Sequence, residues 1–181
     1  MSSSVHYMTS EALEAGLATI RQSPKDEGEL QLIVRRPQTD AREVLQAGSL
    51  TLEDGLVGDK WKDGQRRPDL QLTIMNSRVI SLLAQERANW PLAGDQLFVD
   101  LDLSAENLPA GTQLAIGCAI IEVSAPPHNG CKKFSARFGP DAVAFVNSPV
   151  GKQLHLRGIN ARVLRPGEIR IGDRARKLKQ T

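Results

Sequence analysis

The segment from Pro126 to Pro140 holds the side chains most able to do chemistry: one cysteine, Cys131, with a histidine, two lysines and an arginine nearby. From Val123 to Pro140 the sequence has no carboxylate, so no local negative charge offsets these cations. A free cysteine titrates near about 8.5, and neighbouring cations or a helix N-terminus can lower this pKa to roughly 3.5 to 7.5. The resulting thiolate can serve as nucleophile, sulfur carrier or soft-metal ligand. Cys131 is therefore the first candidate functional residue.

A short helix over residues 131–138 is predicted to position this thiol. Residues that end strands or cap helices flank it: Pro126, Pro127, His128, Asn129, Gly139 and Pro140. Cys131 would lie in the first turn, where free backbone N–H groups and the helix dipole stabilise an anion. The alternative is a structural cysteine, because Cys131 shares one helical stripe with Phe134 and Phe138.

The rest of the composition narrows the class of protein. A chain of 181 residues with 24% charged residues is predicted to form a single globular domain. A net charge of +2 and 4% aromatic residues argue against a nucleic-acid polymer as partner. The sequence shows neither a long apolar segment nor a signal peptide, so we expect no membrane association and a cytoplasmic location. The two cysteines form no Cys-x-x-Cys pair, which argues against a structural zinc site.

Periodicity predicts more strand than helix. Short strands with frequent Gly and Pro, and no alternation of strand and helix, indicate a mainly β (α+β) fold, an antiparallel barrel decorated with a few short helices. Strands are expected at 30–36, 70–75, 96–101, 113–116, 118–123, 159–164, 168–171 and 174–178. Helices are expected at Ser10–Arg21, at 40–48 behind an Asp40 capping box, after Asn76 or Ser77, and at 131–138 and 141–147. Cys118 falls within an alternating strand and is interpreted as a buried, structural residue.

Taken together, several motifs resemble the MOSC family, named for the C-terminal domain of molybdenum cofactor sulfurase, and in particular its short stand-alone bacterial members. The resemblance runs from about residue 30 to residue 177. It rests on the following blocks, given by residue number: Gly55-Leu56-Val57-Gly58-Asp59, Arg66-Arg67-Pro68-Asp69, 70–76, Gly94-Asp95-Gln96-Leu97, 104–108, 127–134 and 158–163. It implies an N-terminal helical extension over 1–29 and one MOSC domain over 30–178.

The resemblance implies that Cys131 carries sulfur as a persulfide or ligates molybdenum in the pterin cofactor, molybdopterin. Thiolate suits both roles, while cations and N–H groups suit the cofactor's phosphate. The candidate cofactor-binding residues are His128, Asn129, Lys132, Lys133 and Arg137 beside Cys131, with Arg67, Asn76 and Asn160 from the other blocks. Lys133 and Arg137 could equally form a solvated helix face. Asp59 is interpreted mainly as a turn residue that holds its own backbone.

Three functions stay open. The first is a sulfur carrier or molybdenum-cofactor-binding protein; because a chain of this length has no room for a pyridoxal-phosphate cysteine desulfurase domain, a partner would supply the sulfur. The second is a molybdenum-dependent reductase of N-hydroxylated compounds, which would need an external electron donor. The third, outside the family, is a Cys-His thiol enzyme or a plain binding module, with His128 or the more distant His155 as the base.

Overall fold

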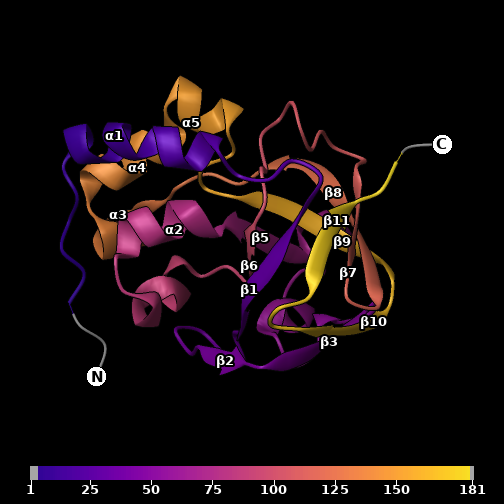
Figure 1. The fold of residues 1–181 in the computed structure, drawn as a ribbon. Helices are drawn as coiled ribbons and strands as arrows, with labels where there is room; N and C mark the ends of the chain where they lie inside the picture. The colour runs from indigo at the N-terminus through magenta and orange to yellow at the C-terminus, as the bar shows by residue number, and fades with distance from the viewer. Residues whose placement is uncertain (1–3, 180–181) are drawn as a thin grey trace.

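A computed structural model describes residues 4–179 of the chain (Figure 1). In this part of the chain the large sheet has the strand order β11-β7-β8-β9-β5-β6-β1-β2, and β1 also pairs with β11, so the sheet closes into a barrel. Neighbouring strands run antiparallel except β5 and β6, which are parallel. The predicted barrel with short helices is therefore confirmed, with one parallel pair that the sequence analysis did not foresee.

The elements are short, as the frequent Gly and Pro residues indicate. The strands of the large sheet are β1 (Glu27–Arg35), β2 (Glu43–Leu45), β5 (Leu72–Asn76), β6 (Leu97–Asp100), β7 (Gln113–Ile116), β8 (Ala119–Pro127), β9 (Ile159–Arg165) and β11 (Arg174–Lys177). A second sheet contains β3 (Ala47–Thr51), β4 (Gly55–Leu56) and β10 (Gly167–Arg170). The helices are α1 (Ser10–Arg21), α2 (Ser77–Ala84), α3 (Lys132–Phe138), α4 (Pro140–Asn147) and α5 (Pro149–Gln153), with 3-10 turns η1 (Lys60–Asp63), η2 (Pro68–Leu70) and η3 (Arg87–Ala93).

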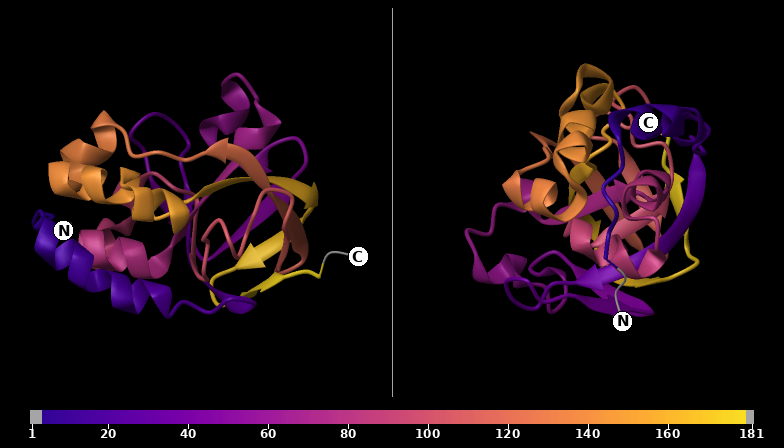
Figure 2. Two further views of the ribbon diagram at one scale, coloured as in Figure 1. Left: turned by 90° about the horizontal axis from the view of Figure 1, so that it is seen from above. Right: turned by 90° about the vertical axis from the view of Figure 1, so that its left-hand side faces the viewer.

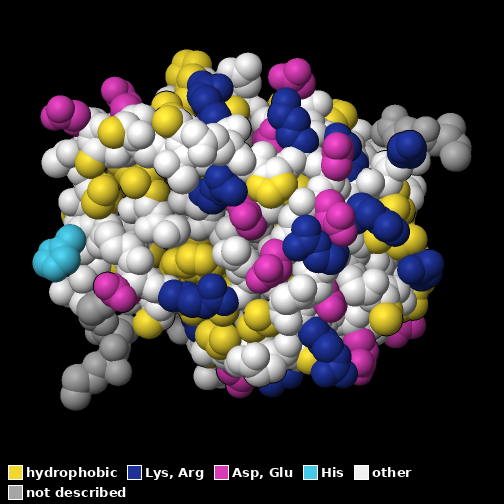
Figure 3. Space-filling model, viewed as in Figure 1, with side chains coloured by type: hydrophobic (Ala, Val, Ile, Leu, Met, Phe, Trp, Pro, Cys, Tyr) yellow, Lys and Arg dark blue, Asp and Glu magenta, His cyan; other side chains and the backbone are white. Residues whose placement is uncertain are grey.

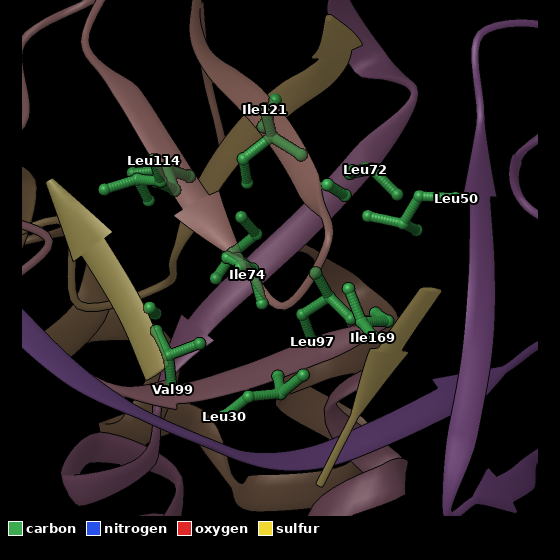
Figure 4. Close-up of a cluster of buried hydrophobic side chains, with 14 of the residues drawn as sticks. Leu30, Leu50, Leu72, Ile74, Leu97, Val99, Leu114, Ile121 and Ile169 are labelled. Atoms are coloured by element: carbon green, nitrogen blue, oxygen red, sulfur yellow. The ribbon is translucent and has the colours of Figure 1, made fainter. Parts of the chain in front are cut away.

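Two hydrophobic clusters lie on the two faces of the barrel wall. One fills the barrel interior (Figure 4) and includes Leu30, Ile74, Leu97, Val99, Leu114 and Ile121. The other lies outside the barrel and joins Val34, Met75 and Phe98 of the wall to Leu13, Val79, Phe134 and Phe138 of the helices. Side chains alternate along β5 and β6, so Ile74 points inward and Met75 outward. The helices consequently gather on one side of the barrel (Figure 2).

The sequence predicted most elements but not the segment after Asp40. The structure has α1 at its predicted bounds, and Asn76 caps α2 through a hydrogen bond from the Arg78 N–H to its Oδ1 at 2.8 Å. The helix predicted at 40–48 is wrong. Asp40 has a left-handed φ of 62°, which a helix N-cap does not adopt. Val44 of β2 pairs with Val34 of β1, so strand pairing prevails over the local capping signal.

The exterior shows no general charge bias on the face seen in Figure 3, where Lys and Arg side chains are interspersed with Asp and Glu over the barrel. None of the helices in residues 4–179 has the length and apolar composition needed to span a bilayer.

Gly28 is a position in β1 where a side chain does not fit. A Cβ atom there would lie 1.8 Å from the carbonyl oxygen of Asp100 on the neighbouring strand. We expect Gly28→Ala to lower the free energy of unfolding by about 1 to 3 kcal/mol, because the two strands must separate to admit it. Urea denaturation measures this. Gly64→Ala is the control, since its Cβ would meet only the Trp61 carbonyl at 3.5 Å; equal losses in both variants would contradict the expectation.

Candidate functional site

The loop before α3 is held in place by one asparagine of α4. Asn147 accepts from the Gly130 N–H through Oδ1 at 2.9 Å and donates from Nδ2 to the Gly130 carbonyl at 3.0 Å. A Cβ on Gly130 would lie 2.9 Å from Val143 and Val146, so only glycine allows this close approach. The next residue, Cys131, is thereby fixed at the start of the helix.

Cys131 is exposed and occupies the N-cap position of α3. The sequence predicted it in the first turn, so its observed position is one residue earlier. Its side chain makes no regular capping hydrogen bond. Even so, its thiol pKa is lowered, first by the Phe134 N–H and then by the Lys133 N–H and the charges of Arg157 and Arg137, while partial burial opposes the shift. Phe134 and Phe138 are buried in the helix cluster. Cys131 does not join them there, so the structure contradicts the interpretation of this residue as part of the core.

Three arginines from two distant segments of the chain meet at Gly94. Arg36 donates from Nη1 to the Gly94 carbonyl at 3.0 Å. A Cβ on Gly94 would lie 3.6 Å from both Arg42 Nη2 and Arg137 Nη1. Arg137 also donates to the Leu92 carbonyl at 2.9 Å, which links α3 to the end of η3. The closed barrel therefore brings together cations that are far apart in the sequence.

Two lysines extend this group, and we call Arg36, Arg42, Lys60, Lys133 and Arg137 the cationic cluster. The pKa of Lys60 is lowered by burial and then by the charges of Arg36, Arg42 and Lys133, and the pKa of Arg42 by burial and then by Arg137 and Arg36. Asp40 and Asp59 oppose the shift of Arg42. Burial and the neighbouring cations both disfavour the charged forms of Lys60 and Arg42, and a bound anion would offset the repulsion among these cations.

Asp59 is fully engaged within the protein. Its Oδ1 accepts from the Trp61 N–H at 3.0 Å, and its two oxygens pair with the Arg36 guanidinium at 2.8 Å each. It also accepts from the Arg36 N–H at 2.9 Å. The interpretation of Asp59 as a residue that holds backbone is confirmed, and Asp59 fixes Arg36 in the cationic cluster.

Beneath Cys131 lies a buried ion pair. Arg157 donates from Nη1 to Asp95 Oδ2 at 2.6 Å and from Nη2 to the Ala93 carbonyl at 3.0 Å. Its guanidinium carbon lies 4.8 Å from the centre of the Phe134 ring, a cation–π contact. Asp95 is 0% exposed and Arg157 is 7% exposed, so both charges depend on each other for compensation. The pair supports the first turn of α3 from below.

His128 faces the same carboxylate from the other side. Its Nδ1 lies 3.5 Å from Asp95 Oδ1, and neither atom makes a hydrogen bond to any described residue. Burial lowers the pKa of His128 to about 4, against the attraction of Asp95. His128 is therefore neutral at pH 7, and its contact with Asp95 is not an ion pair.

The pKa of His128 makes stability depend on pH. Since its folded pKa of about 4 lies below its ordinary value of 6.5, the unfolded chain binds the proton first as the pH falls. The stabilisation is complete above pH 6.5 and should decline by about 1 to 3 kcal/mol between pH 6.5 and pH 4. Urea denaturation across this range measures it, and His128→Asn should flatten the curve. Equal slopes in both proteins would contradict this assignment.

A family model described as MOSC domain matches residues 71–176. The chain belongs to the MOSC domain family. Solved structures of similar fold include the YuaD protein from Bacillus subtilis, with 19% identity, a TM-score of 0.60 and coverage of 85% of this chain and 97% of that one. YiiM from Escherichia coli has 22% identity, a TM-score of 0.57 and coverage of 84% and 71%, respectively. No protein with a curated function matches in sequence.

The remaining predicted cofactor-binding residues of this MOSC domain differ in their exposure and in their partners. Lys132 is exposed at the start of α3, and Asn129 is exposed beside His128. Arg67 pairs with Asp69 at 3.1 Å and lines a cavity of about 440 Å³ together with Arg36 and Lys60 of the cationic cluster.

Two predicted cofactor ligands have internal partners. Asn76 is 4% exposed; besides capping α2, its Nδ2 donates to Ser23 Oγ at 2.9 Å and to the Leu101 carbonyl at 3.0 Å. Both the Nδ2 and the Oδ1 of Asn76 therefore make hydrogen bonds within the protein. Asn160 donates to the Pro126 carbonyl and lines a separate hollow along β8 and β9.

The structure contradicts the prediction of a buried Cys118. It lies in the tight turn between β7 and β8 and is exposed. Ile116 pairs with Ala119, so Gly117 and Cys118 form the turn, with a left-handed φ of 53° at Gly117. The alternating pattern of β8 begins one residue later than predicted.

Sequence reasoning missed Arg36, Arg42, Lys60, Asp95 and Arg157 as site residues. Asp95 was noticed only as part of a family block, and Arg157 directly precedes another block. No local pattern marks an arginine that will be buried against a distant carboxylate. Asp59 could have indicated Arg36. The sequence predicts that Asp59 holds backbone N–H groups, and in the structure one of these belongs to Arg36, whose guanidinium also pairs with Asp59.

Proposed function

We propose that this MOSC domain binds the molybdenum cofactor, with Cys131 directed to the metal or to transferred sulfur and the cationic cluster directed to the cofactor's phosphate. One observation carries the proposal: a cysteine with a lowered thiol pKa lies beside mutually repelling cations. Arg137 belongs to both features, since its charge acts on Cys131 and on Arg42.

The residues fit this cofactor in their chemistry. A thiolate is a soft ligand that suits molybdenum, and arginine and lysine suit phosphate. Lys60 and Lys133 have no ion pair with a described residue, so their charges are available to a ligand. The cavity of about 440 Å³ lined by Trp61 and Arg67 adjoins the cationic cluster through Arg36 and Lys60 and offers an aromatic surface for a planar ring. When bound, the cofactor would supply two-electron redox chemistry at the metal.

The same thiol suits sulfur carriage. The N–H groups of Phe134 and Lys133 lower the pKa of Cys131 by favouring its anionic form, and they would favour a terminal persulfide anion in the same place. Sulfur would come from a partner cysteine desulfurase that holds pyridoxal phosphate. Metal content distinguishes the two uses: bound molybdenum favours a reductase of N-hydroxylated compounds, and metal-free protein that accepts sulfur favours a carrier.

A Cys-His thiol enzyme is less well supported. In such an enzyme a neighbouring histidine activates the thiol. Here the influences that lower the Cys131 pKa are backbone N–H groups and arginines, and no histidine is among them. His155 is instead held by the Leu103 carbonyl at 2.7 Å from its Nδ1.

Replacing the two unpaired lysines tests the cationic cluster. We expect Lys60→Gln/Lys133→Gln to weaken binding of isolated molybdenum cofactor roughly tenfold or more at low salt, with a smaller effect at high salt because ions screen the charges. The melting temperature should stay the same or rise, since Lys60 is repelled by its neighbours. Lys25→Gln/Lys179→Gln makes the same charge change at other exposed positions. Equal affinity in both double variants would show that Lys60 and Lys133 are solvated surface charges that do not bind the cofactor.

A further inference from the structure

A cavity of about 570 Å³ lies between α1, α4 and α5, on the side of the barrel where the helices gather. In the left view of Figure 2, α1 forms one side of this region and α4 with α5 the other. Neither Cys131 nor any member of the cationic cluster lines the cavity. One wall, α1, precedes residues 71–176, which match the family model. The cavity is therefore separate from the candidate site around Cys131, and a segment outside the matched domain helps to build it.

The lining of the cavity is mostly apolar. Phe145 of α4 is 7% exposed and belongs to the hydrophobic cluster outside the barrel, and Leu17 of α1 packs against the same cluster. Ala144, Pro149 and Val150 complete the apolar lining. An apolar group that displaces water from these side chains gains free energy in proportion to the area that it covers.

Hydrogen bonds at two junctions hold the walls in place. The Ser10 N–H donates to Asp141 Oδ2 at 3.1 Å, which joins the first turn of α1 to the first turn of α4. Ser148 Oγ donates to the Phe145 carbonyl at 2.7 Å and accepts from the Gly151 N–H at 3.0 Å, which fixes the junction of α4 and α5. The cavity is therefore formed by the fold itself, and a ligand does not have to order these helices.

Both charged residues in the lining are acidic. Glu14 lies on α1 and Asp141 on α4, so the two carboxylates come from different walls. Neither forms an ion pair with any residue between 4 and 179. The lining contains no Lys, Arg or His. The protein therefore leaves this negative charge uncompensated, and the charge attracts a cation and repels an anion.

We propose that this cavity binds a small organic ammonium ion whose apolar body is one or two rings in size. The apolar lining receives the ring, while the ammonium group donates to Glu14 and to the Asp141 oxygen that Ser10 does not use. The volume lies in the usual range of small-molecule sites. A metal ion fits less well, because no three His, Cys, Asp or Glu side chains among the described residues form a group that could hold one. This site does not depend on the function proposed for Cys131.

Ligand-detected NMR on the full chain, with three probes that share a phenyl ring but differ in charge, tests the proposal. Phenethylamine, a cation, should bind saturably with Kd at or below about 1 mM. The uncharged 2-phenylethanol should bind at least about fivefold more weakly, and the anion 3-phenylpropionate more weakly still. Added salt should weaken the binding of phenethylamine, because Glu14 and Asp141 are both accessible to solvent.

Variants of the lining test the residues assigned to the ligand. Glu14→Gln removes one charge, and Asp141→Asn removes the other but keeps an oxygen that accepts the Ser10 N–H. Ala144→Leu, at an exposed position of α4, reduces the volume of the cavity. Each should weaken the binding of phenethylamine at least about threefold. Glu11→Gln is the matched control, since it makes the same charge change on α1 outside the lining.

The controls separate this site from the site at Cys131. Glu11→Gln and Cys131→Ser should both bind phenethylamine as the unmodified protein does, and Glu14→Gln should keep the melting temperature measured without ligand, because Glu14 has no ion pair to lose. The proposal is overturned if phenethylamine does not bind saturably, or if 2-phenylethanol or 3-phenylpropionate binds as tightly. It is also overturned if Glu14→Gln and Asp141→Asn both bind normally, or if only a Lys-rich helical peptide binds, which would make the cavity a protein docking site.

Discussion

Cys131→Ser is expected to abolish persulfide formation and molybdenum ligation while the fold stays intact. Serine keeps the size and hydrogen-bonding capacity of the residue but lacks the soft, polarisable sulfur that both roles need. Cys131 is exposed at the N-cap of α3, so the substitution should change the free energy of unfolding by less than about 1 kcal/mol. Persulfide formation is measured as sulfane sulfur after incubation with a cysteine desulfurase. Molybdenum ligation is measured as metal content, and the free energy of unfolding by urea denaturation.

The second cysteine supplies a matched control. Cys118 is also exposed, but it lies in the turn between β7 and β8, away from α3 in the fold (Figure 1). Cys118→Ser should therefore retain both activities. If Cys131→Ser unfolds, or if sulfur and metal loading follow Cys118 instead, the assignment of the functional thiol is wrong.

Asp95→Ala is expected to have the largest effect on stability, about 3 to 5 kcal/mol at pH 7. Both partners of the Asp95–Arg157 pair are buried, and the substitution leaves the Arg157 charge without its carboxylate. The remaining contacts of Arg157, with the Ala93 carbonyl and the Phe134 ring, cannot neutralise it. Guanidinium denaturation measures the loss. Asp95→Leu/Arg157→Met should recover much of it, because no buried charge remains.

A surface ion pair on β8 and β9 provides the comparison. Glu122 and Arg162 lie 2.7 Å apart, but 49% of the Arg162 side chain is exposed to solvent. Glu122→Ala should therefore cost only about 0 to 1 kcal/mol. A loss in Asp95→Ala as small as that in Glu122→Ala would show that Arg157 is not dependent on Asp95.

The fold was largely predictable wherever a local pattern and the tertiary packing agree. Ser10–Arg21 has a capping Thr9 and an apolar stripe with Leu13 buried, and the helix forms at its predicted bounds. The segment after Asp40 has a capping pattern as well, but Val44 finds a partner strand in β1, and that partner is invisible to a local pattern. Cys118 was misplaced because one residue of slip moves a side chain from the strand into the turn.

The candidate site was predictable only in part. Cys131 and its neighbours Lys133 and Arg137 come from one continuous segment, so their proximity follows from the sequence. Arg36 and Arg42 meet Arg137 only because the barrel closes and brings the end of β1 to η3 and α3. Asn76 was predicted both as a helix cap and as a cofactor ligand; the cap is confirmed, and its amide also bonds Ser23 and the Leu101 carbonyl, which no local pattern indicates.

The central claim is tested most directly by analysing molybdenum, pterin fluorescence and sulfane sulfur on protein produced in a host that makes the cofactor and purified without added reductant. We predict that the unmodified protein carries molybdenum with pterin, or sulfane sulfur, in an amount comparable to that of the chain, and that Cys131→Ser carries neither. Protein that retains no molybdenum, pterin or sulfane sulfur, or a Cys131→Ser variant loaded to the same level, would contradict the account.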